Sequence, residues 1–113
     1  MSGPARGDIW LGRLDPVIGH ETAGMRPLLV VSVDPFNDGP ADLVIALPVT
    51  STLRGIASHV VVRPPEGGLK NPSAVQCEAV RSVSKRRLAR RWGRISPATM
   101  SLVEDRLRIL LGL

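Results

Sequence analysis

Short apolar runs, separated by Gly, Pro, Asn and Asp, follow one another along most of this chain. Five of them predict β-strands, at residues 8–14, 28–33, 43–49, 59–63 and 74–83. The second run shows no alternation of apolar and polar residues, so we expect its strand to be buried on both faces. Pro48, near the end of the third run, indicates an edge strand or a bulge. Residues 51–57 are expected to form a loop.

The pattern changes to a helical one near the C-terminus. Residues 86–91 favour a short helical turn, and a small strand or turn is expected at 92–95. Ser96 and Pro97 are typical of a helix start, because serine caps and proline suits the first helical position. An apolar stripe follows at 3-4-3 spacing, made of Met100, Val103, Leu107 and Leu110. We interpret it as core packing, which predicts a mainly β fold with a C-terminal α-helix, as a small barrel or strongly bent sheet.

Length and cysteine content narrow the class of protein. A chain of 113 residues makes a single domain, in which residues 1–5 are expected to be a tail. Its one cysteine, Cys77, allows no internal disulfide and favours a reducing compartment. With only two histidines beside it, a zinc site built from Cys and His alone is excluded. Neither a signal peptide nor a membrane span is recognisable, so we expect a cytoplasmic protein.

Charge indicates the kind of partner. The formal net charge is +5 and the sequence pI is near 11, which favours a polyanion such as nucleic acid. The chain has no Tyr, one Phe and two Trp, too few for the aromatic platforms of RRM or OB-type domains. RNA would therefore be bound through loops, guanidinium groups and hydrogen bonds.

Residues 19–27 combine the groups that a phosphodiester reaction needs. His20, Glu21 and Arg26 lie within seven positions, on a segment marked as a loop by Gly and Pro, just before the most apolar run. The histidine and the glutamate can hold or move a proton, whereas the arginine is a permanent cation that suits phosphate.

Five motifs, in order and at matching spacing, resemble the MazF/PemK (Kid) family of toxin endoribonucleases. They are RGDIW at 6–10; LDP at 14–16 with GHE at 19–21 and GMRP at 24–27; LPVTS at 47–51; VRSVSKRRL at 80–88; and GRIS at 93–96 with the closing helix. The resemblance covers nearly the whole chain. It implies one domain over residues 1–113 with an SH3-like barrel, the plasmid maintenance toxin fold also found in CcdB-like toxins, and a homodimer.

The resemblance also implies an activity. Family members are toxins of type II toxin–antitoxin systems that cut single-stranded RNA, mostly mRNA, at a short sequence and so inhibit translation and growth. They need no metal or other cofactor, and a cognate MazE-like antitoxin restrains them. The RNA 2′-hydroxyl is the nucleophile, so the enzyme supplies a base, a cation and an acid. The expected products carry a 2′,3′-cyclic phosphate and a 5′-hydroxyl.

Arg26, Thr50 and Ser51 are the candidates for binding the scissile phosphate. Arg26 matches the arginine of the family's Arg-Pro motif, and its planar fork can grip two phosphate oxygens. Thr50 and Ser51 follow the strand at 43–49, where a hydroxyl could bond the phosphate or merely cap a turn.

The acid and base are less clearly assigned. His20 and Glu21 are adjacent, so on extended chain only one is expected to face the phosphate. His20 aligns with a Kid-branch histidine that stabilises the transition state; it could serve as the acid or be structural. Glu21 could be a base or could orient Arg26.

Gln76 and Glu78 lie two apart on the predicted strand at 74–83 and so would share a face. The Kid branch has an arginine acid and an aspartate base there. Glu78 keeps the carboxylate, but Gln76 cannot act as an acid and is expected only to contact RNA. If Glu78 is the base, the acid is His20 or Arg26, and the high pKa of arginine favours His20. The other histidine, His59, is expected on a strand surface.

A basic run covers residues 81–94, with seven Lys or Arg and no acidic residue. It could be a solvated face, could steer RNA, or could receive an acidic antitoxin tail. Arg81, Arg86 and Arg87 are the RNA contacts we expect from it.

Two alternative functions remain open. A CcdB-like toxin would bind DNA gyrase without catalysis and would need no constellation of Arg26, Thr50 and Glu78. A catalytically weak RNA-binding module is compatible with the glutamine at position 76.

Overall fold

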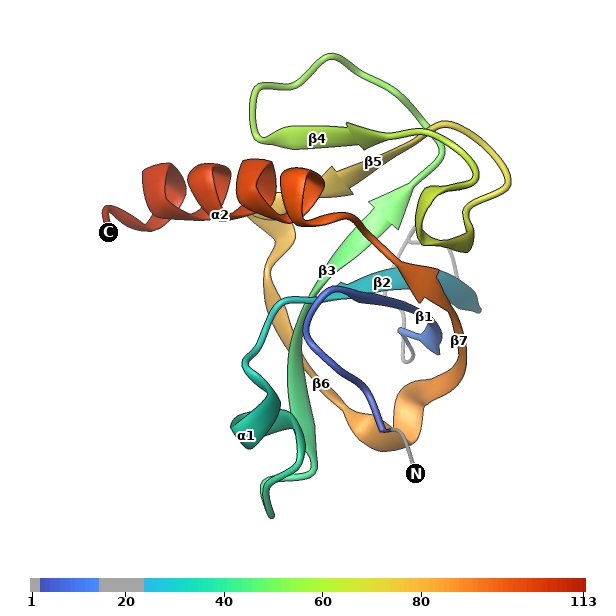
Figure 1. The fold of residues 1–113 in the computed structure, drawn as a ribbon, viewed down its shortest axis with the longest axis vertical. Helices are drawn as coiled ribbons and strands as arrows, with labels where there is room; N and C mark the ends of the chain where they lie inside the picture. The colour runs from blue at the N-terminus through green and yellow to red at the C-terminus, as the bar shows by residue number, and fades with distance from the viewer. Residues whose placement is uncertain (1–2, 15–23) are drawn as a thin grey trace.

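The computed structural model describes residues 3–14 and 24–113, which form a strongly bent antiparallel sheet crossed by one long helix (Figure 1). The strands are β1 (Asp8–Arg13), β2 (Met25–Val30), β3 (Leu43–Thr50), β4 (His59–Val62), β5 (Ser73–Gln76), β6 (Arg81–Ser84) and β7 (Leu88–Arg94). The helices are α1 (Asp34–Asn37), α2 (Pro97–Leu111) and the short 3₁₀ turns η1 (Glu66–Gly68), η2 (Cys77–Ala79) and η3 (Lys85–Arg87). The predicted mainly β fold with a C-terminal helix is confirmed.

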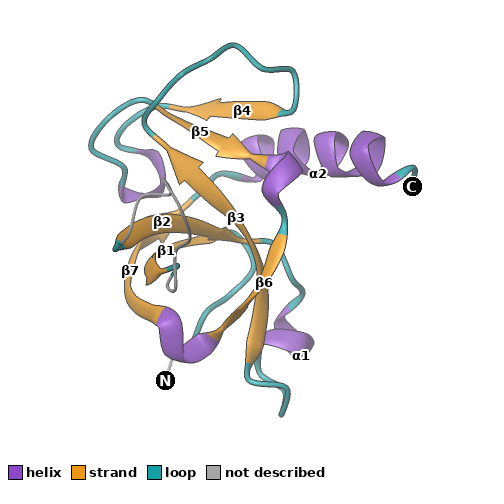
Figure 2. Cartoon of the chain, turned by 180° about the vertical axis from the view of Figure 1, so that it is seen from behind, coloured by secondary structure: helices purple, strands orange, loops and turns teal. Residues whose placement is uncertain are grey.

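β3 organises the sheet, whose strand order is β4-β5-β3-β2-β1-β7, with β6 also paired to β3 (Figure 2). β2 lies along one side of β3. On the other side, residues 43–46 of β3 pair with β6, and Val49 and Thr50 pair with β5. The single strand predicted at 74–83 is therefore wrong: it is two strands with η2 between them. Both halves carry buried apolar residues, so their pattern in sequence looks like one strand.

Of the two positions that Pro48 indicated, an edge strand or a bulge, the edge strand is wrong. Pro48 pairs with Leu28 of β2 inside the sheet. Its position falls between the stretches of β3 that pair with β6 and with β5. The missing proline N–H therefore breaks no bond of either of those two ladders.

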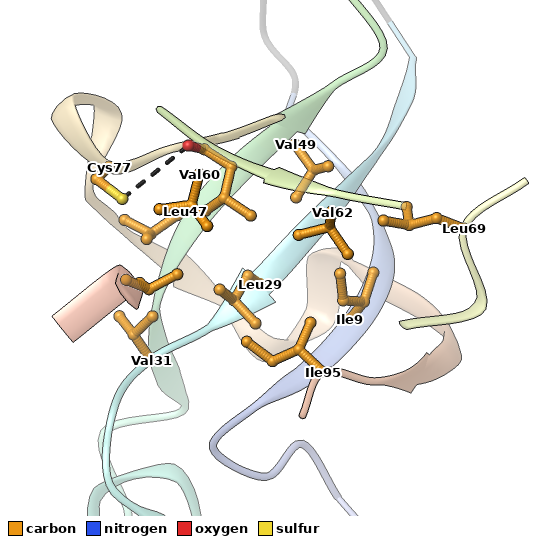
Figure 3. Packing of buried hydrophobic residues seen from close by; sticks show 12 residues of the cluster. Ile9, Leu29, Val31, Leu47, Val49, Val60, Val62, Leu69, Cys77 and Ile95 are labelled. Atoms are coloured by element: carbon orange, nitrogen blue, oxygen red, sulfur yellow. Dashed lines mark hydrogen bonds between the residues drawn. The ribbon is translucent and has the colours of Figure 1, made fainter. Parts of the chain in front are cut away.

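Burial of β2 on both faces is confirmed, although this strand begins three residues earlier than predicted. Leu28 and Leu29 point to opposite faces, and both are 0% exposed. Leu29 belongs to the larger apolar cluster, together with Ile9, Leu47 and Val62 (Figure 3). Leu28 belongs to a second cluster on the other side of the strand.

Helix α2 begins where the sequence indicated. The Ser96 hydroxyl accepts a hydrogen bond from the Thr99 backbone N–H at 3.1 Å, and Pro97 is the first helical residue. Val103 is fully buried, and Met100 and Leu107 pack against the same cluster.

The end of the predicted stripe behaves differently. Leu110 is 45% exposed, so its assignment to the core is wrong. Figure 1 shows the reason, because the last turns of α2 extend beyond the sheet. No helix in residues 3–14 and 24–113 combines the length and apolarity needed to cross a membrane.

Turn η1 is fixed by close backbone contacts to β7 and by a bond to α2. A Cβ at Gly68 would lie 2.3 Å from the Trp92 carbonyl oxygen, and a Cβ at Gly93 would lie 2.7 Å from the Gly67 carbonyl carbon. The Glu66 carboxylate accepts the Ser96 backbone N–H at 2.8 Å. These contacts hold the segment that follows η1, residues 69–73, beside β7.

Candidate active site

A cleft of about 310 Å³ lies where β2 begins and β3 ends. The described residues that line it are Met25, Arg26 and Pro27 of β2; Val49 and Thr50 of β3 with Ser51 and Thr52 after it; Leu69, Lys70, Asn71 and Ser73; and Trp92 of β7. The structure thus brings together three residues that the sequence indicated for phosphate binding, namely Arg26, Thr50 and Ser51.

Arg26 is available for an anionic ligand. It is the second residue of β2, where it pairs with Gly12 of β1, and it is half-buried. Within the described part of the chain, its guanidinium makes no hydrogen bond and no ion pair. All five of its N–H donors can therefore serve a ligand.

Thr50 makes the turn-capping bond considered for it and keeps a donor for a ligand. Its hydroxyl oxygen accepts the backbone N–H of Thr52 at 3.1 Å, which is a turn-capping bond. The hydroxyl proton stays free to donate into the cleft, because a hydroxyl can accept and donate at once. Ser51 is exposed at the same rim.

The described lining is cationic. Arg26 and Lys70 are its charged members, and it includes neither an acidic side chain nor a histidine. Such a lining suits a phosphate but provides no general base. Nor do the described residues include a group of three or more His, Cys, Asp or Glu that could hold a metal ion.

His20 and Glu21 lie outside the described residues, within 15–23. What the structure does place is the two ends of that segment. Arg13 of β1 faces Met25 of β2, one position before Arg26. β1 therefore ends, and β2 begins, next to Arg26.

Glu78 does not line the cleft. It lies in η2, where its carboxylate accepts the Ser58 hydroxyl at 2.7 Å, and His59 Nε2 lies 2.9 Å from the other carboxylate oxygen. Partial burial works to raise the pKa of Glu78, but these hydrogen bonds outweigh it, so the pKa lies below its ordinary value. Glu78 is thus an ionised carboxylate held by its neighbours.

The argument that Gln76 and Glu78 share one strand face is wrong, because β5 ends at Gln76 and Glu78 belongs to the 3₁₀ turn. Gln76 is half-buried and pairs with His59 in the β4–β5 ladder. Like Glu78, it is not among the described residues of the cleft.

His59 is buried rather than exposed on a strand surface. Its side chain is 3% exposed, and its Nδ1 atom is buried without a hydrogen-bond partner among the described residues. The sequence-based expectation failed because α2 and η2 both pack against the edge strand β4. Nothing in the sequence signals this cover.

Cys77, which lies between Gln76 and Glu78 in the sequence, is also buried. Burial, and to a lesser extent the neighbouring charge of Glu78, raises the pKa of the Cys77 thiol to about 11. The thiol is therefore protonated and unreactive at neutral pH.

Part of the basic run has a structural role. Arg91 and Arg94 lie 3.1 and 3.2 Å from the buried Asp8 carboxylate, and Lys85 donates to the Asn37 carbonyl at 2.7 Å. These three are therefore not simply a solvated face.

The three arginines predicted to contact RNA lie outside the described cleft lining. Arg81 is exposed at the start of β6. Arg86 and Arg87 lie in η3, 3.5 Å from the Asp42 carboxylate and the Arg13 carbonyl, respectively.

Sequence reasoning missed one wall of the cleft. Lys70, Asn71 and Ser73 come from the segment after η1, and Trp92 comes from β7. The glycines at 67, 68 and 93 were the available signal, since glycine permits close backbone approach. Their pairing is visible only in three dimensions.

Comparison with known proteins agrees with this architecture. Residues 5–111 match the family model described as PemK-like, MazF-like toxin of type II toxin-antitoxin system. The chain belongs to this family. It is 34% identical over 113 residues to endoribonuclease MazF9 of Mycobacterium tuberculosis, covering 96% of each chain. It is also 30% identical over 109 residues to endoribonuclease EndoA of Bacillus subtilis, covering 96% of this chain and 94% of EndoA.

The fold is that of solved MazF structures. A chain in the MazE-MazF crystal structure (Form-II) from Deinococcus radiodurans matches with a TM-score of 0.85 at 29% identity. The match covers 100% of this chain and 99% of that one. The whole chain, including the residues that line the cleft, therefore has the MazF fold.

Proposed function

We propose that this family member is the toxin of a type II toxin–antitoxin pair and a sequence-specific endoribonuclease acting on single-stranded RNA, chiefly mRNA, in the cytoplasm. The observation that carries the proposal is the cleft lined by both Thr50 and Arg26, whose guanidinium has no partner among the described residues. Relatives named endoribonucleases, similar over almost their whole length, support the same reaction.

The reaction needs no metal in this proposal. A base removes the 2′-hydroxyl proton, the 2′-oxygen attacks phosphorus, and the bond from phosphorus to the 5′-oxygen breaks. An acid then protonates the leaving 5′-oxygen, which yields a 2′,3′-cyclic phosphate and a 5′-hydroxyl. Arg26 stabilises the charge that builds on the phosphoryl oxygens, and Thr50 donates a hydrogen bond to one of them.

His20 is the acid in this scheme, because an imidazole releases a proton near neutral pH and an arginine does not. Two carboxylates compete for the role of base. Glu21 is five positions from Arg26 along the chain, whereas Glu78 lies outside the cleft and is already bound by Ser58 and His59. We therefore infer that Glu21 is the base for a phosphate bound beside Arg26. Acting together with the adjacent His20, it requires residues 20 and 21 to lie on a loop, as Gly and Pro in 19–27 predict, and not on extended chain.

A MazE-like antitoxin and a second copy of the chain are the protein partners that we infer. A complex of MazE with MazF has been solved for the relative from Deinococcus radiodurans. The net charge of +5 suits an acidic partner. Apolar side chains at the end of α2 offer surface that a partner would cover, with Ile109 75% and Leu113 85% exposed.

The decisive test is cleavage of a long single-stranded RNA in EDTA by the purified protein and by Arg26→Ala. Discrete cuts are expected, with a rate that falls about 10²- to 10³-fold in the variant, since one charge-stabilising donor is removed. Arg108→Ala is the matched control, because Arg108 lies in the last turn of α2 and pairs with Asp105 at 3.2 Å. It should cut like the wild type.

A substrate with 2′-deoxy nucleotides at the cut sites tests the nucleophile. Cleavage of that substrate would exclude the proposed reaction. Absence of any cleavage, with gyrase inhibited, would favour the CcdB-like alternative, and RNA binding alone would favour the binding module. Glu21→Gln and Glu78→Gln then separate the two carboxylates, since only loss of the base removes the acidic limb of the rate profile.

A further inference from the structure

We propose that Trp92, Asn71 and Lys70 form a nucleotide subsite beside Arg26, in which the indole stacks on one base of the RNA. This inference rests on the proposed function and adds to it the residues that select the cut sequence. All three line the cleft that Arg26 and Thr50 share.

Two rigid elements place the subsite. Trp92 is half-buried and packs against the main apolar cluster, which fixes its position on β7. Gly68 lies directly against the Trp92 carbonyl, so the segment that follows η1 runs alongside this residue. Lys70 and Asn71, two and three residues after Gly68, line the same cleft as Trp92.

The polar groups of the subsite are available to a ligand. Asn71 uses its backbone carbonyl to accept the Ser73 hydroxyl at 2.9 Å, whereas its carboxamide has no partner among the described residues. Lys70 is exposed and likewise makes no ion pair there. The Trp92 indole N–H has no partner in the same part of the chain and is not among its buried unpaired atoms.

These side chains match the parts of one nucleotide. An indole offers a flat apolar surface for a base, a carboxamide offers a donor and an acceptor for the base edge, and an ammonium offers a charge for a phosphate. The cleft volume of about 310 Å³ is at the lower end for small-ligand sites, which suits a nucleotide and excludes a folded segment. The low aromatic content argues only against extended platforms, not against one stacked base.

Binding can be measured without cleavage by using an RNA that carries a 2′-deoxy nucleotide at the cut site. In a Trp10→Phe background Trp92 is the only indole, and its fluorescence is expected to be quenched by this RNA. Trp92→Ala should raise the Kd roughly 5- to 150-fold, and Trp92→Phe should restore most of the affinity. Matching thermal midpoints for the two variants would show that both are folded.

Sequencing of the cut ends tests selectivity. Trp92→Ala and Asn71→Ala should relax the base preference at one position next to the cut and leave the others unchanged. Lys70→Ala should weaken cleavage of all sequences alike, because a phosphate contact carries no base information.

Unchanged affinity and unchanged base preference in Trp92→Ala, with the wild type still cutting RNA, would overturn the subsite and leave the proposed function standing. The reverse outcome is also distinguishable. If the wild type cuts no RNA, but RNA quenches Trp92 fluorescence and Asn71→Ala abolishes that quenching, the subsite would stand and the proposed function would fall. RNA that binds without quenching Trp92 also contradicts the subsite.

Discussion

Among the charged residues of this chain, the partners of each group decide what it can do. Arg26 and Lys70 line the cleft without ion pairs in the described part of the chain, so their charge is available to RNA. Arg91 and Arg94 are the same kind of cation, but Asp8 holds them. Glu78 is likewise an ionised carboxylate whose oxygens are occupied. Residue type alone does not separate these cases.

Glu66 gives a prediction for pH. Partial burial works to raise the pKa of Glu66, but the Ser96 backbone N–H and the side chains of Thr99 and Ser96 outweigh it, so the pKa lies below 4.5. Because the pKa of Glu66 is lower in the folded state, its ionised carboxylate stabilises the folded protein fully at pH values above 4.5. This stabilisation is lost as the pH falls through the folded-state pKa. Glu66→Gln should cost about 1 kcal/mol at neutral pH and less at an acidic pH below the folded-state pKa, measured by urea unfolding.

Asp105→Asn is the control for this effect. Asp105 is an exposed carboxylate on α2 that pairs only with Arg108 in the described structure. Its replacement should change the unfolding free energy by less than about 0.5 kcal/mol at either pH. An equal loss for Glu66→Gln at both pH values would show that its charge does not stabilise the start of α2.

At the level of elements, the cleft has two sides, one made by β2 and β3 and the other placed by the contact between η1 and β7. β2 and β3 supply Arg26 and Thr50, and their pairing through Leu28 and Pro48 fixes this side of the cleft. The opposite wall, residues 69–73, has its place because Gly68 and Gly93 bring two backbones together. A small change at that contact therefore acts on the site.

Gly68→Ala tests this dependence. Its new methyl would lie 2.3 Å from the Trp92 carbonyl oxygen, and the residue has a φ of +73°. We expect a loss of about 2–4 kcal/mol in unfolding free energy, from the clash and the left-handed backbone together, and weaker RNA binding. Gly55→Ala is matched, since Gly55 has a φ of +65° but nothing within 4 Å.

Gly55→Ala should lose only about 1 kcal/mol of unfolding free energy, because its left-handed backbone is strained but its methyl meets no atom. It should bind RNA like the wild type. Similar losses in the two variants would mean that the contact of η1 with β7 does not position the cleft wall. Chemical denaturation and fluorescence titration with the uncleavable RNA measure the two quantities.

Across the whole molecule, charge and shape act together. The net charge of +5 favours a polyanionic partner, and the bent sheet leaves a cleft at one end of β3. Its two cations, Arg26 and Lys70, make no ion pair with other described residues. In the proposed function, long-range attraction would bring RNA to the protein, whereas the cleft would decide which phosphate is bound.

Salt dependence separates these contributions. Each phosphate contact on single-stranded nucleic acid contributes about 0.7 to the slope of log Kd against log salt. Arg26→Ala and Lys70→Ala are each expected to reduce that slope by about this amount, in titrations with the uncleavable RNA. Arg108→Ala, remote on α2, should leave it unchanged. A slope that responds equally to all three would indicate binding by net charge without a defined site.

Much of the fold was predictable because it depends on local pattern. Short apolar runs located β1 to β4, and the Ser-Pro pair located the start of α2. β7 (Leu88–Arg94) was largely missed, because a helical turn was expected at 86–91. The errors share a different cause. The break of 74–83 into β5 and β6, the burial of His59 and the position of Pro48 all depend on which segment packs beside another.

By itself, the sequence determined the fold class and the family and supplied the candidates for binding the phosphate, because strand pattern, helix caps and motif spacing are properties of neighbouring positions. Tertiary structure alone decided which of those residues share a site. It placed Arg26 with Thr50, left Glu78 bound to His59 elsewhere, and added Asn71 and Trp92 as a wall. The physical reason is that burial and close backbone contact arise between segments far apart in the chain, where no local pattern records them.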